Sequence, residues 1–203
     1  MDIHEERSMK SYNQKADNYD DTPDGKFTYR FKEQLVKIIR IPEGGSVLDI
    51  ACGNGRLLQM LSRGHHFSGY GVDISEKMVE NARRIDPGMV FETARCNQLP
   101  FEAAFFDVVT VCAAFHHFPD IAGFAKEAFR VVKPNGMLYI AEVYYPAFFR
   151  TIFNPFIRFM QEGDVKLYAP EEITRLLQRT GFTNEVLRIE DNIQVIGARR
   201  RAG

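Results

Sequence analysis

The fold of this chain of 203 residues is decided by one short stretch, Val47-Leu48-Asp49-Ile50-Ala51-Cys52-Gly53-Asn54-Gly55-Arg56-Leu57. Its apolar first half reads as a buried strand, and its two glycines then form a tight turn at the start of a helix. Glycine allows a ligand to approach the backbone closely, and in α/β sheets such turns lie at the carboxyl ends of strands, where ligands bind. Glycines also serve as plain turns, so the stretch favours a nucleotide-like ligand without excluding a purely structural turn.

Apolar, strand-like runs alternate with segments of helical period along the chain. The expected strands cover residues 46–51, 67–73, 89–93, 106–113, 136–143, 183–189 and 193–199, the fifth of them following the turn Lys133-Pro134-Asn135-Gly136. The expected helices cover residues 56–63, 76–84, 121–132 and 170–180. This alternation predicts an α/β domain with βαβ units around a parallel sheet, and the two adjacent late strands predict an antiparallel pair at its end.

Two segments fall outside this alternation. Residues 1–40 combine a polar, turn-prone half around residues 20–25 with a helical half in which Phe31 and Leu35 have core spacing. The early part of this segment is expected to lie over a site as a lid. Residues 144–169 are rich in phenylalanine and interrupted by two prolines, which is typical of an insertion.

The composition indicates one domain spanning residues 1–203, because 45% hydrophobic residues are ample for a single core. The 26 basic residues nearly balance the 27 acidic ones, which disfavours nucleic acid and anionic membrane surfaces as partners. The three cysteines form no CxxC pair, so neither a disulfide framework nor a metal site is expected. No apolar run reaches the roughly 20 residues of a membrane helix, and the N-terminus contains no apolar leader, which favours the cytoplasm. Nothing in the sequence indicates the oligomeric state.

Two acidic residues indicate which of the candidate ligands the glycine loop is suited to bind. Asp49 lies on the strand before the glycines, where it would repel a pyrophosphate but attract the amino group and sulfonium of S-adenosylmethionine (SAM). Leu58 stands where a dinucleotide fingerprint has its third glycine, and no P-loop lysine follows. Asp73 ends the second strand, where a carboxylate can accept hydrogen bonds from both ribose hydroxyls. Its alternative role is to cap the turn before Ser75.

These motifs, taken in order, resemble those of the class I SAM-dependent methyltransferase superfamily, particularly its small-molecule enzymes of the ubiquinone and menaquinone biosynthesis type. The resemblance covers roughly residues 12–140. Residues 47–57 resemble the glycine-rich first motif, Gly71-Val72-Asp73-Ile74-Ser75 resembles the ribose-binding second strand, and Leu99-Pro100-Phe101 with Phe106-Asp107-Val108-Val109 resembles the run into the fourth strand. The resemblance implies a Rossmann-like, seven-stranded, mainly parallel sheet with helices on both faces and its last strand antiparallel. It also implies SAM as methyl donor and S-adenosylhomocysteine (SAH) as product.

The resemblance further implies which residues hold the cofactor. Asp49 and Gly53 are expected around its methionine moiety, and Asp73 on its ribose. Ile74 or Met78 is expected near its adenine. The full expected cofactor-binding set is Tyr19, Asp49, Ala51, Gly53, Gly55, Asp73, Ile74, Met78, Cys96, Asn97 and Cys112.

One residue departs from the family pattern. The family usually has, shortly before Leu99-Pro100, an aspartate that accepts a hydrogen bond from the adenine amino group, and Arg95 stands there. Because a guanidinium only donates, adenine recognition would use the backbone of Cys96 or Asn97, the Asn97 side chain, or water. Alternatively, Arg95 turns outward and its charge is solvated.

The chemistry of methyl transfer requires few special side chains. It is an in-line displacement that depends mainly on holding donor and acceptor in line, so no nucleophilic residue is needed. An oxygen or nitrogen acceptor can also need its proton removed, and His116 and His117 are the candidate bases. The resemblance favours His117 as the general base, while the alternative is that both histidines are structural.

The resemblance also implies roles for residues that cover the cofactor and for residues near the methyl acceptor. Tyr19 resembles an N-terminal motif that folds over the cofactor, or else it simply packs within the lid. The family places acceptor-specific structure in the segment 144–169, where Arg150 and Arg158 would meet an anionic group on an otherwise apolar acceptor. The phenylalanines of this segment also fit core or dimer contacts.

The sequence therefore predicts a cytoplasmic enzyme that transfers a methyl group from SAM to a small-molecule acceptor, apolar or aromatic in character. One alternative is a non-catalytic module that binds SAM or SAH, which only Arg95 favours. Another is a nicotinamide-dependent oxidoreductase, which Asp49 and the missing third glycine disfavour. Nucleic-acid methylation is disfavoured because the chain has no Asn-Pro-Pro-Tyr-like motif, no nucleophilic Pro-Cys and no basic stripe.

Overall fold

The computed structural model describes residues 2–157 and 163–202, and every strand and helix expected from the sequence is present within them. The strands are β1 (Gly45–Ile50), β2 (Phe67–Asp73), β3 (Val90–Thr93), β4 (Phe106–Cys112), β5 (Val132–Val143), β6 (Phe182–Glu190) and β7 (Ile193–Arg200). The helices are α1 (Ile3–Lys15), η1 (Ala16–Asp21), α2 (Pro23–Ile38), α3 (Arg56–Ser62), α4 (Glu76–Ile85), η2 (Phe115–His117), α5 (Ile121–Val131), α6 (Ala147–Ile157) and α7 (Pro170–Thr180).

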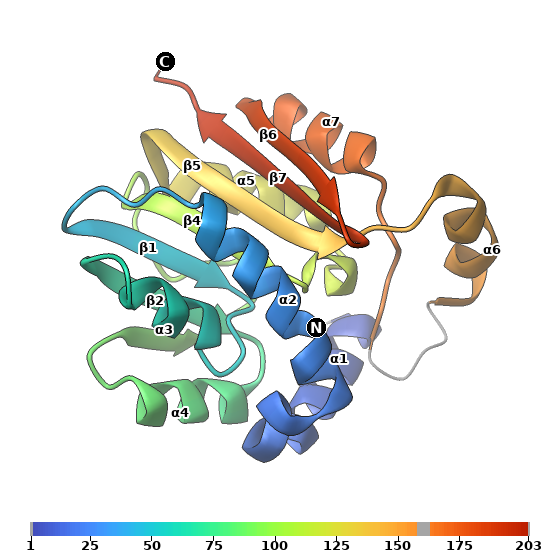
Figure 1. Cartoon of the computed structure of the whole chain (residues 1–203), viewed down its shortest axis with the longest axis horizontal. Helices are drawn as coiled ribbons and strands as arrows, with labels where there is room; N and C mark the ends of the chain where they lie inside the picture. Colours follow the sequence, from blue (N-terminus) through green and yellow to red (C-terminus); the bar gives the residue numbers. More distant parts are fainter. Residues whose placement is uncertain (1, 158–162, 203) are drawn as a thin grey trace.

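The strands form one sheet in the order β3-β2-β1-β4-β5-β7-β6. Strands β1 to β5 pair in parallel, whereas β7 runs antiparallel to both of its neighbours, β5 and β6. The chain moves outward from β1 to β3 and then returns to β4 on the other side of β1, so the strand order reverses between β1 and β4 (Figure 1). The predicted Rossmann-like fold is confirmed, and its topology puts a ligand site at this switch point.

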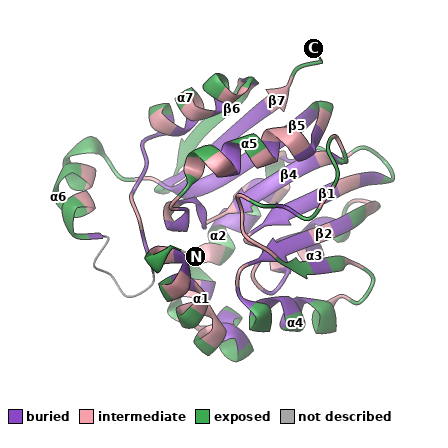
Figure 2. Ribbon diagram, turned by 180° about the vertical axis from the view of Figure 1, so that it is seen from behind, coloured by how far each residue is buried: buried purple, intermediate pink, exposed green. Residues whose placement is uncertain are grey.

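Two apolar cores lie on opposite faces of the sheet. Helices α2, α3 and α4 supply one of them through side chains such as Leu35, Leu57 and Val79 (Figure 1). Helices α5 and α7 cover the other with Phe124 and Leu177 (Figure 2). The central strands are therefore buried on both faces, which explains why their sequences read as nearly continuous apolar runs.

The N-terminal segment contains a helix that the sequence analysis did not predict. A capping box begins α1: the Asp2 side chain accepts from the N–H of His4 at 2.8 Å, and the Glu5 side chain accepts from the N–H of Asp2 at 3.0 Å. Few residues of α1 are apolar, so no hydrophobic period revealed it. Polar contacts attach α1 to the rest of the fold, including a hydrogen bond of 2.7 Å from the Ser75 hydroxyl to Asn13.

Strand β5 begins at Val132 rather than at the expected residue 136. Val132 pairs with Phe106 whereas Met137 pairs with Val108, so the residues between them form a bulge within the strand pair. Asn135 occupies this bulge with a φ of 66°, a left-handed conformation that asparagine adopts more readily than most residues. The residues of the predicted turn, 133–136, therefore belong to β5 and form its bulge.

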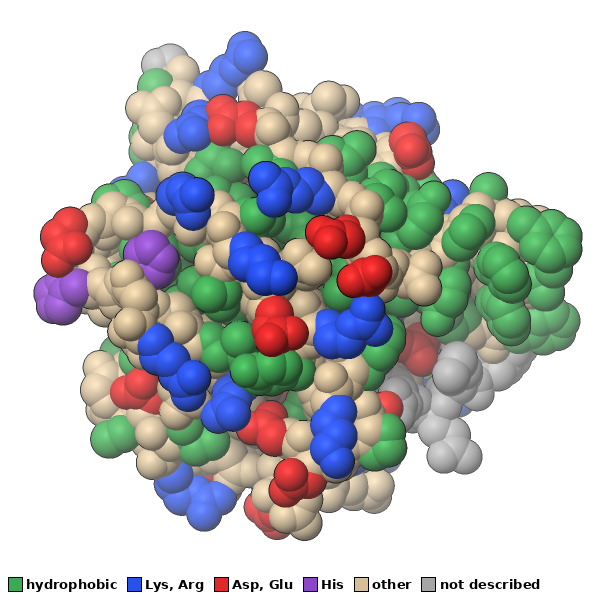
Figure 3. Space-filling model, in the orientation of Figure 1, with side chains coloured by type: hydrophobic (Ala, Val, Ile, Leu, Met, Phe, Trp, Pro, Cys, Tyr) green, Lys and Arg blue, Asp and Glu red, His purple; other side chains and the backbone are tan. Residues whose placement is uncertain are grey.

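The segment after β5 leaves the sheet and forms α6, which stands apart from the layered body (Figure 1). Its phenylalanines gather into an apolar patch on the surface (Figure 3), and the side chains of Phe148 and Phe156 are 70% and 67% exposed. Among the described helices, none combines the length and apolarity that a membrane crossing requires.

Candidate active site

A pocket opens at the carboxyl ends of β1, β2 and β4, and we call it the inner pocket. Its cavity volume is about 100 Å³. Gly53 has a φ of 54°, and a Cβ built on it would meet no atom within 4 Å, so the loop presents bare backbone to the pocket. The lining includes Glu5, Tyr12, Tyr19, Lys32, Asp49, Ala51, Gly53, Asp73, Ile74, Met78, Cys96, Cys112 and His117.

Asp73 ends β2 and fixes the glycine loop. One of its carboxylate oxygens accepts from the N–H of Gly53 and the other from the N–H of Ser75, both at 2.8 Å. Burial raises the pKa of this carboxyl group, and the backbone hydrogen bonds act in the opposite direction. Because each carboxylate oxygen has two lone pairs, Asp73 can still accept hydrogen bonds from a ligand.

Asp49 lies near the end of β1 and is 2% exposed. Burial raises its pKa to about 7, although the hydrogen bond from Thr110 and the charge of Lys32 both lower it. The Thr110 hydroxyl donates to Asp49 Oδ1 at 2.7 Å. The carboxyl group therefore changes its protonation near neutral pH, and a cation in the pocket would favour the charged form.

Two alanines at the ends of adjacent strands have left-handed backbone conformations. Ala51 follows β1 with a φ of 58°, and Ala113 follows β4 with a φ of 52°. Both line the inner pocket. This conformation costs a residue with a Cβ roughly 1–2 kcal/mol, and such strain concentrates at functional sites. The ends of β1 and β4, on the two sides of the switch point, are therefore strained where they line the pocket.

Nine of the eleven residues expected to bind the cofactor line the inner pocket, and Gly55 and Asn97 do not. Gly55 instead begins α3 with a φ of 78°, and a Cβ there would lie 3.0 Å from the Phe91 ring, so tight packing explains this glycine. The Asn97 amide donates to the Asp120 carboxylate at 2.9 Å. The side chain of Asn97 is therefore engaged outside the pocket.

Arg95 is paired with a carboxylate from the N-terminal helix. Its guanidinium donates to the two oxygens of Glu5 at 2.9 and 2.8 Å. The Glu5 side chain is 6% exposed and lines the inner pocket, whereas the Arg95 side chain is 38% exposed and does not. Arg95 therefore neither faces the pocket nor extends freely into solvent. It holds an acidic side chain at the pocket wall.

The histidine pair lies in η2, just after β4. His117 is 8% exposed, and its Nε2 lies 3.0 Å from the Tyr12 hydroxyl oxygen. Burial holds the pKa of His117 well below its ordinary value, and the charges of His116 and Lys15 lower it further. The Nδ1 of His116 lies 2.8 Å from a carboxylate oxygen of Glu142, a fully buried residue of β5. Because its pKa is held well below the ordinary value, His117 is neutral in the folded protein.

A second pocket, with a cavity volume of about 710 Å³, adjoins the first, and we call it the apolar pocket. Phenylalanines of α2 and α6, such as Phe31 and Phe153, form much of its wall. The two pockets share the residues Tyr12, Tyr19, Thr28, Ala113 and His117. The two pockets are therefore adjacent.

Of the two arginines expected on the acceptor side, the structure describes only Arg150, and it is not part of this wall. The Arg150 guanidinium donates to the backbone carbonyl of Tyr145, and Arg150 lines neither pocket. Arg158 lies outside the described residues.

The sequence analysis expected the early part of residues 1–40 to lie over a site as a lid, but it named no site residue in what the structure shows as α1 and α2. Glu5 and Tyr12 come from α1, and Lys32 comes from α2. The capping box at Asp2 and Glu5 was a readable signal for the start of a helix. The capping box does not, however, indicate that Glu5 contacts Arg95, which is 90 residues away along the chain.

Comparison with protein families matches residues 48–140 to the methyltransferase domain family. The chain is 34% identical over 121 residues to 27-O-demethylrifamycin SV methyltransferase of Amycolatopsis mediterranei, covering 57% of this chain and 44% of that protein. It is 39% identical over 105 residues to 2-methyl-6-phytyl-1,4-hydroquinone methyltransferase of Synechocystis sp., covering 50% and 33%. It is 27% identical over 175 residues to demethylmenaquinone methyltransferase of Thermotoga maritima, covering 75% and 76%. The chain thus spans less than half the length of the first two relatives.

Solved structures share the fold. The methyltransferase in a complex with the Trm112 activator of Haloferax volcanii superposes with a TM-score of 0.82 at 18% identity, covering 94% of this chain and 98% of that one. A SAM-dependent methyltransferase of Aquifex aeolicus superposes with a TM-score of 0.71 at 21% identity, covering 93% and 98%. The matched domain, the strand order and the glycine loop with its two acids agree: residues 48–140 match a methyltransferase domain, and the chain has the fold of solved SAM-dependent methyltransferases.

Proposed function

We propose that the protein transfers a methyl group from SAM to an apolar or aromatic small molecule, and that the acceptor is of the hydroquinone class. The observation that carries this proposal is the shared wall between an inner pocket with acidic residues and an apolar pocket. Relatives named for a hydroquinone and for demethylmenaquinone support an aromatic acceptor with a long apolar part. The cavity volume of the apolar pocket, about 710 Å³, leaves room for such a molecule.

The residues of the inner pocket suit SAM. When bound, it supplies a methyl group activated by a sulfonium. The charged form of Asp49 attracts its cationic end, and Asp73 accepts hydrogen bonds from the ribose hydroxyls. Glu5 supplies, from α1, an acidic acceptor for the adenine amino group, a role that the family usually gives to an aspartate at the position of Arg95.

The acceptor side works by positioning and by proton removal. The phenylalanines of the apolar pocket exclude water and hold the acceptor in line with the methyl group. His117 lies in the wall shared by the two pockets, and its neutral ring can take a proton from an acceptor hydroxyl.

The direct test is a methyl-transfer assay with SAM and a panel of hydroquinones that differ in the length of their apolar tail. Mass spectrometry should detect a methylated product, and its yield should rise with tail length because a longer tail fills more of the apolar pocket. Binding of SAM without transfer to any member of the panel would instead favour a non-catalytic binding module. Binding of NADH in place of SAM would favour an oxidoreductase.

The affinity for SAM should depend on pH through Asp49. The pKa of this carboxyl group is about 7 in the free protein, and a bound cation lowers it, so SAM should bind more tightly as the pH rises through 7. Below that value the affinity should fall by up to about tenfold per pH unit. Calorimetric titrations between pH 6 and 8 measure the slope, and an Asp49→Asn variant should bind weakly with no such slope. An identical slope in that variant would assign the titration to another group.

Replacement of His117 by alanine should lower kcat by about 100-fold, the contribution of a typical general base. The Kd for SAM, measured by calorimetry, should change far less than kcat because Asp49 and Asp73 remain. The matched control is His66→Ala, since the side chain of His66 is 84% exposed and lines neither pocket. Wild-type turnover in the His117 variant would remove this residue from the mechanism.

A further inference from the structure

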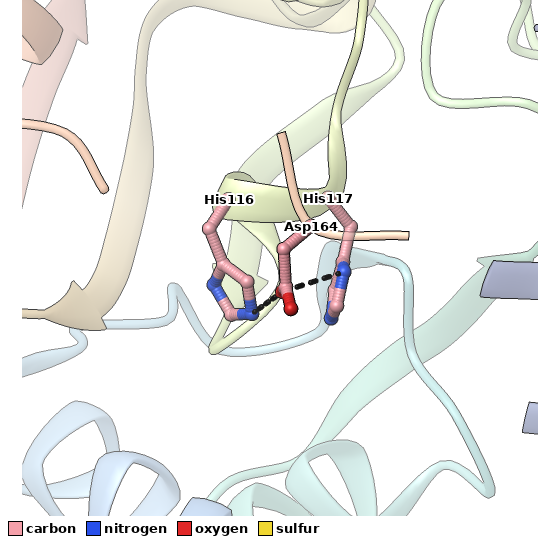
Figure 4. Close-up of side chains that lie close together, drawn as sticks. All are labelled: His116, His117 and Asp164. Atoms are coloured by element: carbon pink, nitrogen blue, oxygen red, sulfur yellow. Dashed lines mark ion pairs between the residues drawn. The ribbon is translucent and has the colours of Figure 1, made fainter. Parts of the chain in front are cut away.

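Three side chains from two distant segments converge at one end of the apolar pocket (Figure 4). The Nε2 of His116 and the Nδ1 of His117 lie 3.4 and 3.3 Å from the same carboxylate oxygen of Asp164. All three atoms lie within 4.8 Å of one another. The backbone fixes this arrangement, because the N–H of Val165 donates to the carbonyl of His116 at 2.8 Å. Asp164 and His117 are only 6% and 8% exposed, so the cluster is built into the fold.

The spacing of these atoms suits a bound cation better than direct hydrogen bonds. The Nδ1 of His117 is buried and has no hydrogen-bond partner among the described residues, although Asp164 lies 3.3 Å away. Around a tetrahedral zinc ion with bonds of about 2.0–2.1 Å, neighbouring ligand atoms are about 3.3–3.4 Å apart. Two imidazole nitrogens and one carboxylate oxygen are ligands that zinc accepts, and together they leave a fourth position open.

The other nitrogen of each ring already faces a partner. The Nδ1 of His116 lies 2.8 Å from the carboxylate of Glu142, and the Nε2 of His117 lies 3.0 Å from the Tyr12 hydroxyl. A histidine that binds a metal usually uses its second nitrogen for such a contact, which fixes the tautomer and the orientation of the ring. The fully buried carboxylate of Glu142 also adds negative charge behind the cluster, which attracts a cation.

From this geometry we propose that His116, His117 and Asp164 bind one divalent cation of the zinc class, with Glu142 and Tyr12 orienting the two rings. All three ligands help to line the apolar pocket, so a molecule in that pocket could supply a fourth ligand. The role of the ion rests on the proposed function: it would bind the hydroxyl oxygen of a hydroquinone in place of a hydroxide ligand, which takes the hydroxyl proton and leaves as water. In the zinc-loaded protein His117 is a ligand of the ion, and its role as a general base is confined to the metal-free protein.

Metal binding can be measured without any assay of activity. The full chain is treated with a chelator and titrated with Zn²⁺ in a calorimeter, and one equivalent should bind. Asp164→Asn and His116→Ala should each weaken this binding by at least about tenfold, because each removes a ligand. His66→Ala removes an exposed histidine and should bind Zn²⁺ as the wild type does. Circular dichroism checks that each variant is folded, and Asp164→Asn keeps the shape of the side chain.

A titration with Co²⁺ tests the ligands in the unaltered protein. The visible absorption bands of four-coordinate cobalt with nitrogen and oxygen ligands are expected. An intense thiolate-to-cobalt band would overturn the proposal, since it would assign the metal to Cys52, Cys96 or Cys112, which are free. No binding to the folded chain, or equal Zn²⁺ affinity in all variants, would overturn it as well.

Titration of the metal-free protein with SAM separates this proposal from the proposed function. Binding of Zn²⁺ without binding of SAM would leave the metal site standing and contradict methyl transfer. Equal rates of methyl transfer in the metal-free and zinc-loaded proteins would contradict the role of the ion and leave methyl transfer standing.

Discussion

Replacement of Asp73 by alanine is expected to weaken the binding of both SAM and SAH by at least about 100-fold. Each hydrogen bond to a charged group contributes about 1.5–3 kcal/mol, and this carboxylate is expected to accept two from the ribose. The substitution also removes the acceptor for the N–H groups of Gly53 and Ser75, so the glycine loop loses its anchor. Isothermal calorimetry with protein freed of copurifying ligand measures the change.

The matched control for this variant is Glu80→Ala, which removes an exposed carboxylate from α4. It should bind both ligands as the wild type does. Wild-type affinity in the Asp73 variant would contradict the assignment of the ribose contact. No binding of SAM to the folded wild type would contradict the proposed methyl donor itself.

Replacement of Phe115 by alanine is expected to lower the free energy of unfolding by about 3–5 kcal/mol, the usual cost of removing a buried phenylalanine ring. This ring is fully buried, and its centroid lies 4.9 Å from that of Tyr168 and 5.6 Å from that of Phe124. The cavity should also loosen His116 and His117, which follow in the same turn, so turnover should fall together with stability. Urea unfolding measures the stability change.

The control for the second variant is Phe148→Ala, because the side chain of Phe148 on α6 is 70% exposed. Its free energy of unfolding should stay close to that of the wild type. A similar decrease in the free energy of unfolding in both variants would contradict the prediction that the buried rings around η2 stabilise the fold more than exposed rings do.

The sequence was sufficient for the sheet and for the acids at its switch point. The stretch from residue 47 to 57 predicted a strand, a tight turn and a helix because those features depend on local apolar period and on glycine conformation. Asp49 and Asp73 could be singled out for the same reason, since each lies at the end of a readable strand. Both line the inner pocket.

The sequence was not sufficient where side chains meet across long separations. Gly55 and Asn97 were expected at the cofactor, yet Gly55 packs against Phe91 and Asn97 bonds to Asp120. The expectation treated the residues of a motif alike, whereas the turn of the backbone determines which of them face the pocket. Local patterns alone do not reveal that direction.

What the sequence by itself determined is therefore the order of strands and helices, because hydrophobic period and turn residues act over a few positions. Only the tertiary structure decided that Glu5 reaches Arg95 and that Asp164 lies between His116 and His117. These contacts join segments with no periodic relation to each other. The packing of α1 and of the chain before α7 against the sheet creates them, and that packing depends on the whole fold.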